Sequence, residues 1–387
     1  IRLKNEIKQI NELLFTNNKT RKNALSEAED LQVKLHVRSE LIKVTNEQAN
    51  SLTRKISLNQ CNIGDQRKEL ELLKEDYEIK HGDITEGLDA RDIEQVRDFL
   101  KGTDAVISAG PFAINKNIGT VAAEMGIGYF DLTEDVETTE FIRSIDTSSV
   151  MMPQCGLAPG AINICAAGMM NQFDKVNEVM MRVGALPRFT NNEMSYYLSW
   201  STNGLINEYC NEADAIYEGK SIKVMPLEGA EKLTIEGEAY EAFNTSGGCA
   251  TMCETYENKV DNLSYKTIRY PGHLNHMKFL FNDLHLKKNK DVLEKLFDKE
   301  VPRTTNDVIV FFVKVIGEIN GVLQEKTYLK KIYGDDTFSA IQRTTASGVC
   351  SVLEMYIDGK IKETGFIKQE SISWDDFIDN KFGSVYI

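Results

Sequence analysis

Three short segments of this 387-residue chain combine small residues with proline, glycine or acidic side chains at the expected ends of strands. They cover residues 108–112 (SAGPF), 131–135 (DLTED) and 154–160 (QCGLAPG). Each follows a short apolar run that is typical of a buried parallel strand. In an open parallel sheet, a ligand lies beyond the carboxyl ends of the strands, and small residues let the backbone touch a flat ring. We therefore expect a ligand site where these segments meet, although ordinary strand-to-helix turns would have the same composition.

Other residues with reactive side chains give weaker patterns. His273 and His276 have a spacing found in zinc sites, but no further ligands follow at metal spacing, so no metal site is expected. The seven cysteines are scattered, without paired CxxC spacing, which indicates a reducing compartment rather than a disulfide framework. Cys249 and Cys253 are expected to be small buried residues.

The elements that must position the three segments form an alternating series. Helix patterns at residues 90–102, 115–126 and 133–145 alternate with strand patterns at residues 104–109, 127–133 and 149–155. This order predicts a βαβαβ unit, the back half of a doubly wound parallel sheet.

After Gly160 the expected strands become longer and pair as hairpins. They cover residues 176–187, 232–243, 263–272 and 307–333, with helices at residues 273–286 and 339–359. Asn320 and Gly321 predict a type I′ turn within the last strand pair. The fold class is therefore α/β: an incomplete Rossmann-like parallel sheet plus a mixed α/β domain, preceded by a helical segment.

That helical segment covers residues 1–82. Before Gly82 the chain contains no proline and one glycine, Gly64, and stepping by seven from Ile7 gives ten apolar or aromatic residues out of eleven. Such a repeat predicts a long helix or coiled coil. No GxGxxG motif occurs in residues 1–110, and a continuous helix offers free N–H groups only at one end. Either a natural or artificial fusion replaced the front half of the domain, or an error of sequence assembly joined an unrelated coiled coil to it.

The charge of the chain restricts its partners. A net charge of −14 argues against a nucleic-acid binder or a binder of anionic membranes. The most apolar stretch, residues 308–317, is too short to span a bilayer, and the charged N-terminus does not look like a signal peptide. We expect a soluble, cytoplasmic protein.

An ordered series of motifs carries a family resemblance: SAGPF, YFDLTEDVETT, PQCGLAPG, RVGALP, WSTNGLINEYC, EAFNTSGG, YKTIRYPGH, TTASGVC and FGSVY. Together they resemble the saccharopine dehydrogenase family, which includes lysine 6-dehydrogenases, over about residues 83–387. The resemblance implies NAD- or NADP-linked hydride transfer at a C–N bond of an amino acid, either saccharopine or the side-chain amine of lysine. It also implies a homodimer, to which the coiled coil could add contacts.

This resemblance and the seven-residue repeat of residues 1–82 together divide the chain into four regions. They are a coiled-coil segment (1–82), the back half of an NAD(P)-binding domain (83–155), a substrate domain (156–340), and a C-terminal helix and tail that return to the first domain (341–387).

The resemblance also assigns roles to individual residues. Those expected at the cofactor are Ser108, Ala109, Gly110, Pro111, Phe112, Asp131, Leu132, Thr133, Gly156, Leu157, Ala158 and Pro159. Those expected at the substrate are Asn244, Thr245, Ser246, Arg269 and Tyr270, with Arg269 binding a carboxylate in bidentate fashion. By the residues' own chemistry, candidates for the group that takes the amine proton are Asp131, Cys155 and His273, although His273 could be a structural histidine and Cys155 a small packing residue.

The missing glycine-rich loop sets this chain apart from the family pattern. We therefore expect weak or absent binding of NAD or NADP. The alternative to an enzyme is a non-catalytic interaction protein, in which the coiled coil assembles chains and the dehydrogenase part is inactive.

Overall fold

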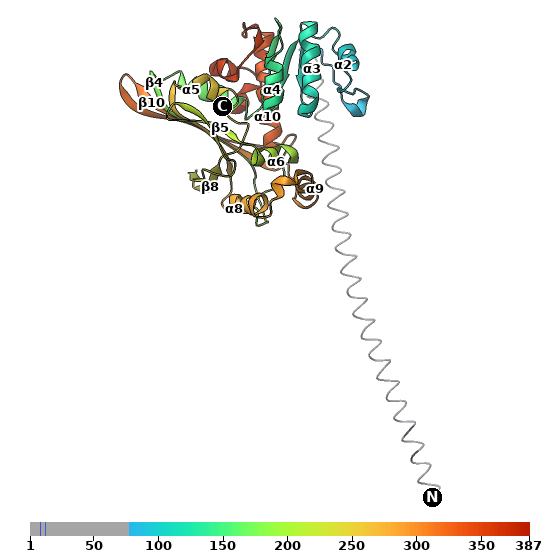
Figure 1. Ribbon diagram of the computed structural model, residues 1–387, viewed down its shortest axis with the longest axis vertical. Helices are drawn as coiled ribbons and strands as arrows, with labels where there is room; N and C mark the ends of the chain where they lie inside the picture. Colours follow the sequence, from blue (N-terminus) through green and yellow to red (C-terminus); the bar gives the residue numbers. More distant parts are fainter. Residues whose placement is uncertain (1–7, 9–11, 13–76) are drawn as a thin grey trace. The chain divides into compact units, whose positions relative to one another are not determined.

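The computed structural model describes Lys8, Glu12 and residues 77–387, and the chain forms two units, Ile1–Ile79 and Lys80–Ile387 (Figure 1). The coiled coil predicted for residues 1–82 falls largely on residues outside the described ones and stays a prediction. All strands of the described residues lie in the second unit.

The first sheet of this unit is parallel. Its strand order is β1-β2-β3-β12, with β1 at one edge and the C-terminal β12 at the other. The strands are β1 (Ala105–Ser108), β2 (Gly128–Asp131), β3 (Val150–Met152) and β12 (Gly365–Phe366). The helical elements before β3 are η1 (Ile84–Glu86), α2 (Ile93–Phe99), α3 (Phe112–Met125) and α4 (Val136–Arg143). The alternating βαβαβ unit predicted from the sequence is confirmed.

Both faces of this parallel sheet are buried, because successive side chains in a strand point to opposite sides. Tyr129 and Met151 pack with residues of α2, α3 and α4 in one apolar cluster. Their neighbours Phe130 and Met152 belong to a second cluster, shared with the large sheet. The short strands are therefore held from both sides, and their carboxyl ends are left to form a site.

The second sheet is mixed and has eight strands. Its main path is β11-β10-β4-β9-β5-β6, while β7 pairs with β8 and β8 with β9; β4 and β9 are parallel and the other pairs antiparallel. The strands are β4 (Lys175–Pro187), β5 (Ala213–Tyr217), β6 (Lys220–Val224), β7 (Glu231–Ile235), β8 (Glu238–Phe243), β9 (Val260–Arg269), β10 (Asp307–Ile319) and β11 (Val322–Tyr333). Asn320 (φ 53°) and Gly321 (φ 74°) both have positive φ, as the predicted type I′ turn requires.

The remaining helices cover this sheet or connect its strands. They are α5 (Ala161–Met170), α6 (Thr202–Cys210), α7 (Met252–Tyr256), α8 (His273–Lys278), the π-helix η2 (Phe279–Asp283), η3 (Leu286–Lys288), α9 (Lys290–Glu300), α10 (Ala340–Ile357), η4 (Gln369–Ser371), α11 (Trp374–Ile378) and η5 (Gly383–Tyr386). The helix predicted at residues 273–286 is confirmed as far as Asp283, because α8 continues directly into the π-helix η2. Its last three residues do not follow the prediction, since the left-handed backbone of His285 (φ 54°) separates η2 from η3.

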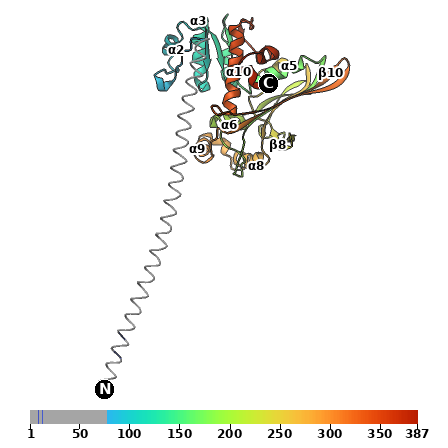
Figure 2. The same cartoon turned by 180° about the vertical axis from the view of Figure 1, so that it is seen from behind.

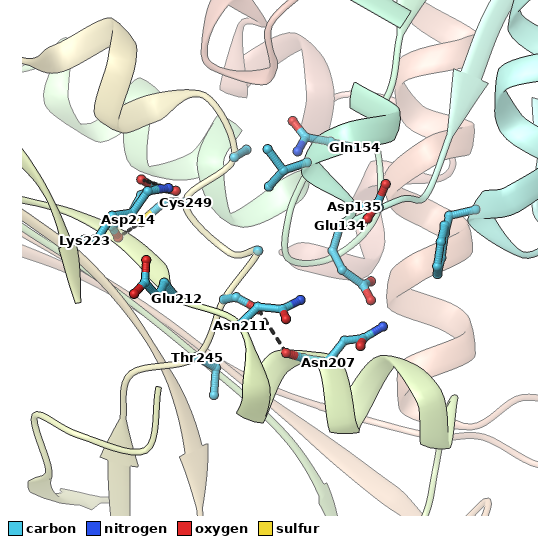
Figure 3. A pocket seen from close by; sticks show the side chains of 15 residues that line it. Glu134, Asp135, Gln154, Asn207, Asn211, Glu212, Asp214, Lys223, Thr245 and Cys249 are labelled. Carbon is cyan, nitrogen blue, oxygen red and sulfur yellow. Dashed lines mark hydrogen bonds and ion pairs between the residues drawn. The ribbon is translucent and has the colours of Figure 1, made fainter. Parts of the chain in front are cut away.

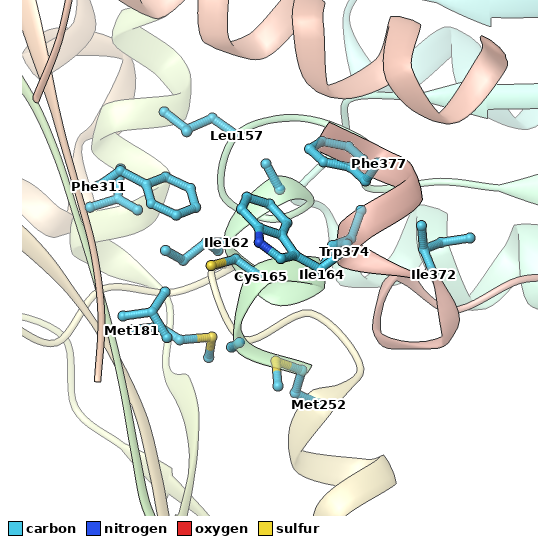
Figure 4. Close-up of a cluster of buried hydrophobic side chains, with 14 of the residues drawn as sticks. Leu157, Ile162, Ile164, Cys165, Met181, Met252, Phe311, Ile372, Trp374 and Phe377 are labelled. Carbon is cyan, nitrogen blue, oxygen red and sulfur yellow. The ribbon is translucent and has the colours of Figure 1, made fainter. Parts of the chain in front are cut away.

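The C-terminal segment ties the two sheets together. Helix α10 contacts β2 of the first sheet and β10 of the second, as Figure 1 and the reverse view in Figure 2 show. After it, β12 joins the parallel sheet beside β3, and α11 brings Trp374 and Phe377 onto α5 (Figure 4). Among the described residues, no helix is both long and apolar enough to cross a membrane.

Candidate functional site

A cavity of about 310 Å³ opens beyond the carboxyl ends of the parallel strands (Figure 3). On the side of the parallel sheet it is bounded by the start of α3, the loop after β2 and the loop after β3. On the other side lie α6, the start of β5 and the loop before α7. Its lining residues are Phe112, Glu134, Asp135, Val136, Gln154, Asn207, Asn211, Glu212, Asp214, Lys223, Thr245, Ser246, Gly247, Cys249 and Ala250.

Asp131 organises the rim of this cavity without lining it. It is fully buried at the end of β2, where its Oδ1 accepts hydrogen bonds from the backbone N–H groups of Thr133 (3.0 Å) and Gln154 (2.9 Å). Its Oδ2 accepts from the Tyr129 hydroxyl (2.6 Å) and from Asn115 Nδ2 (3.1 Å). Burial raises the pKa of Asp131, and these donors oppose that rise. Asp131 thus connects the loops after β2 and β3.

The segment that begins at Cys155 is packed inside the protein. Cys155 is 1% exposed, and its Sγ lies 3.0 Å from the Met152 carbonyl oxygen. Burial raises the pKa of its thiol. Gly156, Leu157 and Pro159 are buried and Ala158 is half-buried. A Cβ at Gly348 of α10 would come within 2.6 Å of the Gly156 carbonyl oxygen. The described cavity does not include these residues, and α10 packs directly against them.

The segment after β1 is more open. Ser108 is buried and donates a hydrogen bond to Asn115 Oδ1 (2.7 Å), whereas Ala109, Gly110, Pro111 and Phe112 are exposed. Phe112 lines the cavity. Of the next predicted segment, Leu132 is half-buried and Thr133 is buried beneath the rim.

The predicted substrate residues divide into two groups. Thr245 and Ser246 line the cavity. Asn244 is buried and is held by backbone hydrogen bonds with Leu227 and Glu228. Tyr270 donates to the Pro187 carbonyl oxygen (3.0 Å), and it lies outside the cavity lining, as does Arg269.

Arg269 is 2% exposed and sits in a polar network. Its Nε donates to the Tyr209 hydroxyl (2.9 Å), and its Nη1 donates to Thr267 Oγ1 (2.6 Å) and to the Ile268 carbonyl oxygen (2.9 Å). Its Nη2 lies 3.8 Å from Glu208 Oε2. Burial raises the pKa of Glu208 to about 8, and the attraction of Arg269 offsets only part of that rise. In this arrangement the guanidinium donates its hydrogen bonds to other groups in the protein interior.

His273 belongs to the same buried network. Its Nδ1 lies 2.9 Å from the Met194 carbonyl oxygen and its Nε2 lies 3.0 Å from the Tyr209 hydroxyl. Burial, together with the nearby Arg269, lowers the pKa of His273 to about 3. The imidazole is therefore neutral near pH 7 and lies away from the cavity lining.

The lowered pKa of His273 predicts a loss of stability in acid. Its folded pKa of about 3 lies below the ordinary value of 6.5, so the unfolded chain binds the proton more readily than the folded one. The contribution is complete above about pH 6.5 and is lost progressively as the pH falls toward 3. Each pH unit in this window should lower the free energy of unfolding by about 1.4 kcal/mol through this group.

Urea unfolding at pH 7.5, 6.5 and 5.5 measures this dependence. His273→Gln should show a shallower decline below pH 6.5 than the wild type, while the neighbouring half-buried His276→Gln should follow the wild type. Equal slopes for His273→Gln and the wild type would contradict the assignment.

The cavity also contains residues that the sequence alone did not single out. Glu134 and Asp135 belong to a strand-end segment that the sequence marked, but no role had been assigned to them. Asn207 lies in α6, within the WSTNGLINEYC motif but without an assigned role, and Asn211 and Glu212 follow directly after this helix. Burial and the adjacent Asp135 raise the pKa of Glu134. In the described residues, no group of three or more metal-ligating side chains lies together.

The site fits one end of a nicotinamide dinucleotide. The exposed stretch from Ala109 to Phe112 and the loops held by Asp131 offer small residues and backbone to a flat ring. In the described part of the chain, however, β1 is an edge strand, and no glycine-rich turn precedes it. The described residues therefore fit the ring end of such a cofactor and not its pyrophosphate.

Comparisons with known proteins point to one family. The profile described as "Saccharopine dehydrogenase C-terminal domain" matches residues 156–381. Apo saccharopine dehydrogenase (L-Glu forming) from Saccharomyces cerevisiae has a similar structure, with 16% sequence identity and a TM-score of 0.64 over 77% of this chain and 86% of that one. A homospermidine synthase from Legionella pneumophila in complex with NAD is similar at 13% identity and a TM-score of 0.52, over 76% of each chain. At these identities, the two structures show that the fold is shared.

Proposed function

Since the chain belongs to the saccharopine dehydrogenase family, we propose that it is an oxidoreductase that uses NAD or NADP to transfer a hydride at a C–N bond. The candidate substrates are saccharopine and lysine. The observation that carries this proposal is the cavity at the carboxyl ends of β1, β2 and β3, which faces α6 and the loop containing Thr245 and Ser246. In an open α/β fold this is the position expected for a ligand.

The chain's own residues would orient the reactants. A bound nicotinamide would supply the hydride chemistry. The wall against its ring would be formed by Ala109, Gly110, Pro111 and Phe112. Gln154 and Thr245 line the adjoining space and offer polar groups to the substrate.

We further propose that Glu134, rather than any of the three earlier candidates, takes the proton that leaves the amine. Asp131 is occupied by four donors, and Cys155 and His273 lie outside the cavity lining. The carboxylate of Glu134 lines the cavity, and its raised pKa brings it nearer to neutrality.

Absorbance at 340 nm tests the proposed activity. The full chain with NAD+ or NADP+ should show reduction of the nicotinamide when saccharopine or lysine is added. Glu134→Gln should lower kcat by about 100-fold, as loss of a general base does. Glu137→Gln is a matched control, because Glu137 is an exposed residue of α4 that pairs with Lys116 outside the cavity. An unchanged kcat in Glu134→Gln would rule out this role.

In the described residues no glycine-rich turn precedes β1, and this favours a second candidate function. In it, the predicted coiled coil of residues 1–82 assembles chains, and the dehydrogenase part is inactive. Titration of the protein with NADH and NADPH, followed by nicotinamide fluorescence, separates the two candidates. Micromolar affinity would contradict the expected weak binding and would favour the enzyme. Sedimentation of residues 1–82 would test whether the predicted coiled coil assembles chains.

A further inference from the structure

Two cysteines lie together at one wall of the cavity. Cys249 lines the cavity in the loop between β8 and α7 (Figure 3), and Cys253 is the second residue of α7. Both side chains are buried in the same apolar cluster, and both are free thiols. Neither thiol has a part in the proposed hydride transfer.

A turn of the backbone brings the two thiols together. The Met252 backbone N–H donates to the Cys249 carbonyl oxygen (3.0 Å), which closes a four-residue turn and returns the chain toward Cys249 at the next residue, Cys253. Hydrogen bonding with Cys249 is the largest of the effects that raise the pKa of Cys253, so the two side chains are direct neighbours. A disulfide requires side chains that already face each other, and this pair meets that condition.

The two thiols differ in their access to the cavity. Cys249 lines it, whereas Cys253 lies outside the lining. The Cys249 Sγ donates to the carbonyl oxygen of Asp214 (3.2 Å), another lining residue. A small molecule in the cavity therefore meets Cys249 first and Cys253 only behind it.

We propose that Cys249 and Cys253 form a reversible oxidation site, in which a hydroperoxide that enters the cavity oxidises Cys249 and Cys253 then closes a disulfide with it. The disulfide removes the proton that Cys249 donates to the Asp214 carbonyl oxygen. Oxidation therefore changes one wall of the cavity.

The reaction balances with hydrogen peroxide as the oxidant. In the first step the Cys249 sulfur attacks one peroxide oxygen, the O–O bond breaks, and the thiol proton goes to the leaving oxygen, which gives a sulfenic acid and water. In the second step the Cys253 sulfur attacks the Cys249 sulfur, the S–O bond breaks, and the hydroxyl group leaves with the Cys253 proton as water. Two thiols lose two electrons and two protons, and the peroxide is reduced to two waters.

Peptide mapping of the full chain after treatment with hydrogen peroxide tests the proposal. Trypsin cleaves after Lys232 and Lys259, so both cysteines lie in one peptide, residues 233–259, which contains no other cysteine. This peptide should lose two hydrogen atoms, resist alkylation, and regain both thiols after treatment with dithiothreitol. If it keeps both thiols under a large excess of hydrogen peroxide, the proposal fails.

Two single variants test the order of the steps. Cys253→Ser should stop the reaction at a sulfenic acid on Cys249, which dimedone traps. In Cys249→Ser, dimedone should label Cys253 about tenfold less, because oxidation follows access and Cys253 lies outside the cavity lining. Equal labelling in the two variants would contradict the assigned order.

Cys350→Ser is the matched control for these variants. Cys350 is half-buried in α10, outside the cavity lining, so its removal should leave the yield of the disulfide unchanged. The mapping of the wild type needs no substitution, and it therefore decides the proposal even if a serine destabilises a variant. None of these measurements uses a nicotinamide cofactor or an amino-acid substrate, so their outcome is independent of the proposed function.

Discussion

Replacing Arg269 with alanine should lower the free energy of unfolding by about 3–5 kcal/mol, the usual cost of removing one partner from a buried charged network. The guanidinium is 2% exposed and donates to Tyr209, Thr267 and the Ile268 backbone. Without it these oxygens lose their donor inside the protein. The side chain of Glu208 also loses its neighbouring positive charge. Urea unfolding monitored by circular dichroism measures the change.

Arg303→Ala provides the control for this experiment. Arg303 forms an ion pair with Asp298 at 2.5 Å, but both side chains are about half exposed, so its removal should cost less than about 1 kcal/mol. If Arg269→Ala kept wild-type stability and instead raised the Michaelis constant for an amino-acid substrate, the earlier expectation of a carboxylate-binding Arg269 would be favoured.

Replacing Trp374 with alanine should also cost about 3–5 kcal/mol, as large-to-small changes of buried aromatic residues do. Its ring stacks on Phe377 (centroids 5.6 Å apart, 19° between planes) and meets Tyr328 edge-on at 5.6 Å. Gly168 of α5 packs closely on it, since a Cβ there would lie 2.5 Å from Trp374 Cβ. Figure 4 shows the indole among side chains of α5, α11 and the large sheet.

Thermal unfolding checks the Trp374 prediction, with Phe189→Ala as the control. Phe189 is 72% exposed, so its removal should leave the melting temperature nearly unchanged. Because Trp374 anchors the segment that follows β12, limited proteolysis of Trp374→Ala should cleave first near the C-terminus. A variant as stable as the wild type would show that this aromatic cluster contributes little.

Much of the fold was predictable because the signals are local. The apolar runs of β1, β2 and β3 and the intervening helices follow from the periodicity of neighbouring residues. The β10–β11 hairpin follows from Asn320 and Gly321, whose positive φ angles suit a type I′ turn. The helix predicted over residues 273–286 was placed three residues too far, because the apolar pattern continues across His285 while the backbone there turns left-handed.

The candidate site was predictable only in part. The sequence located the strand ends, because parallel strands present their carboxyl ends at one edge of a sheet. It did not show that Arg269 and His273 would be enclosed by Tyr196 and Tyr209, since these residues are far apart along the chain. Burial changes what such groups can do, because the environment determines whether a charge binds a ligand or is held by the interior.

By itself, therefore, the sequence determined the family, the alternation of strands and helices, and the segments that end at the rim of the parallel sheet. Only the tertiary structure decided which side chains reach the cavity. It placed Glu134 across from Glu212 and buried Cys155 beneath α10. The physical reason is that periodicity and turn chemistry depend on adjacent residues, whereas burial and charge depend on segments brought together by packing.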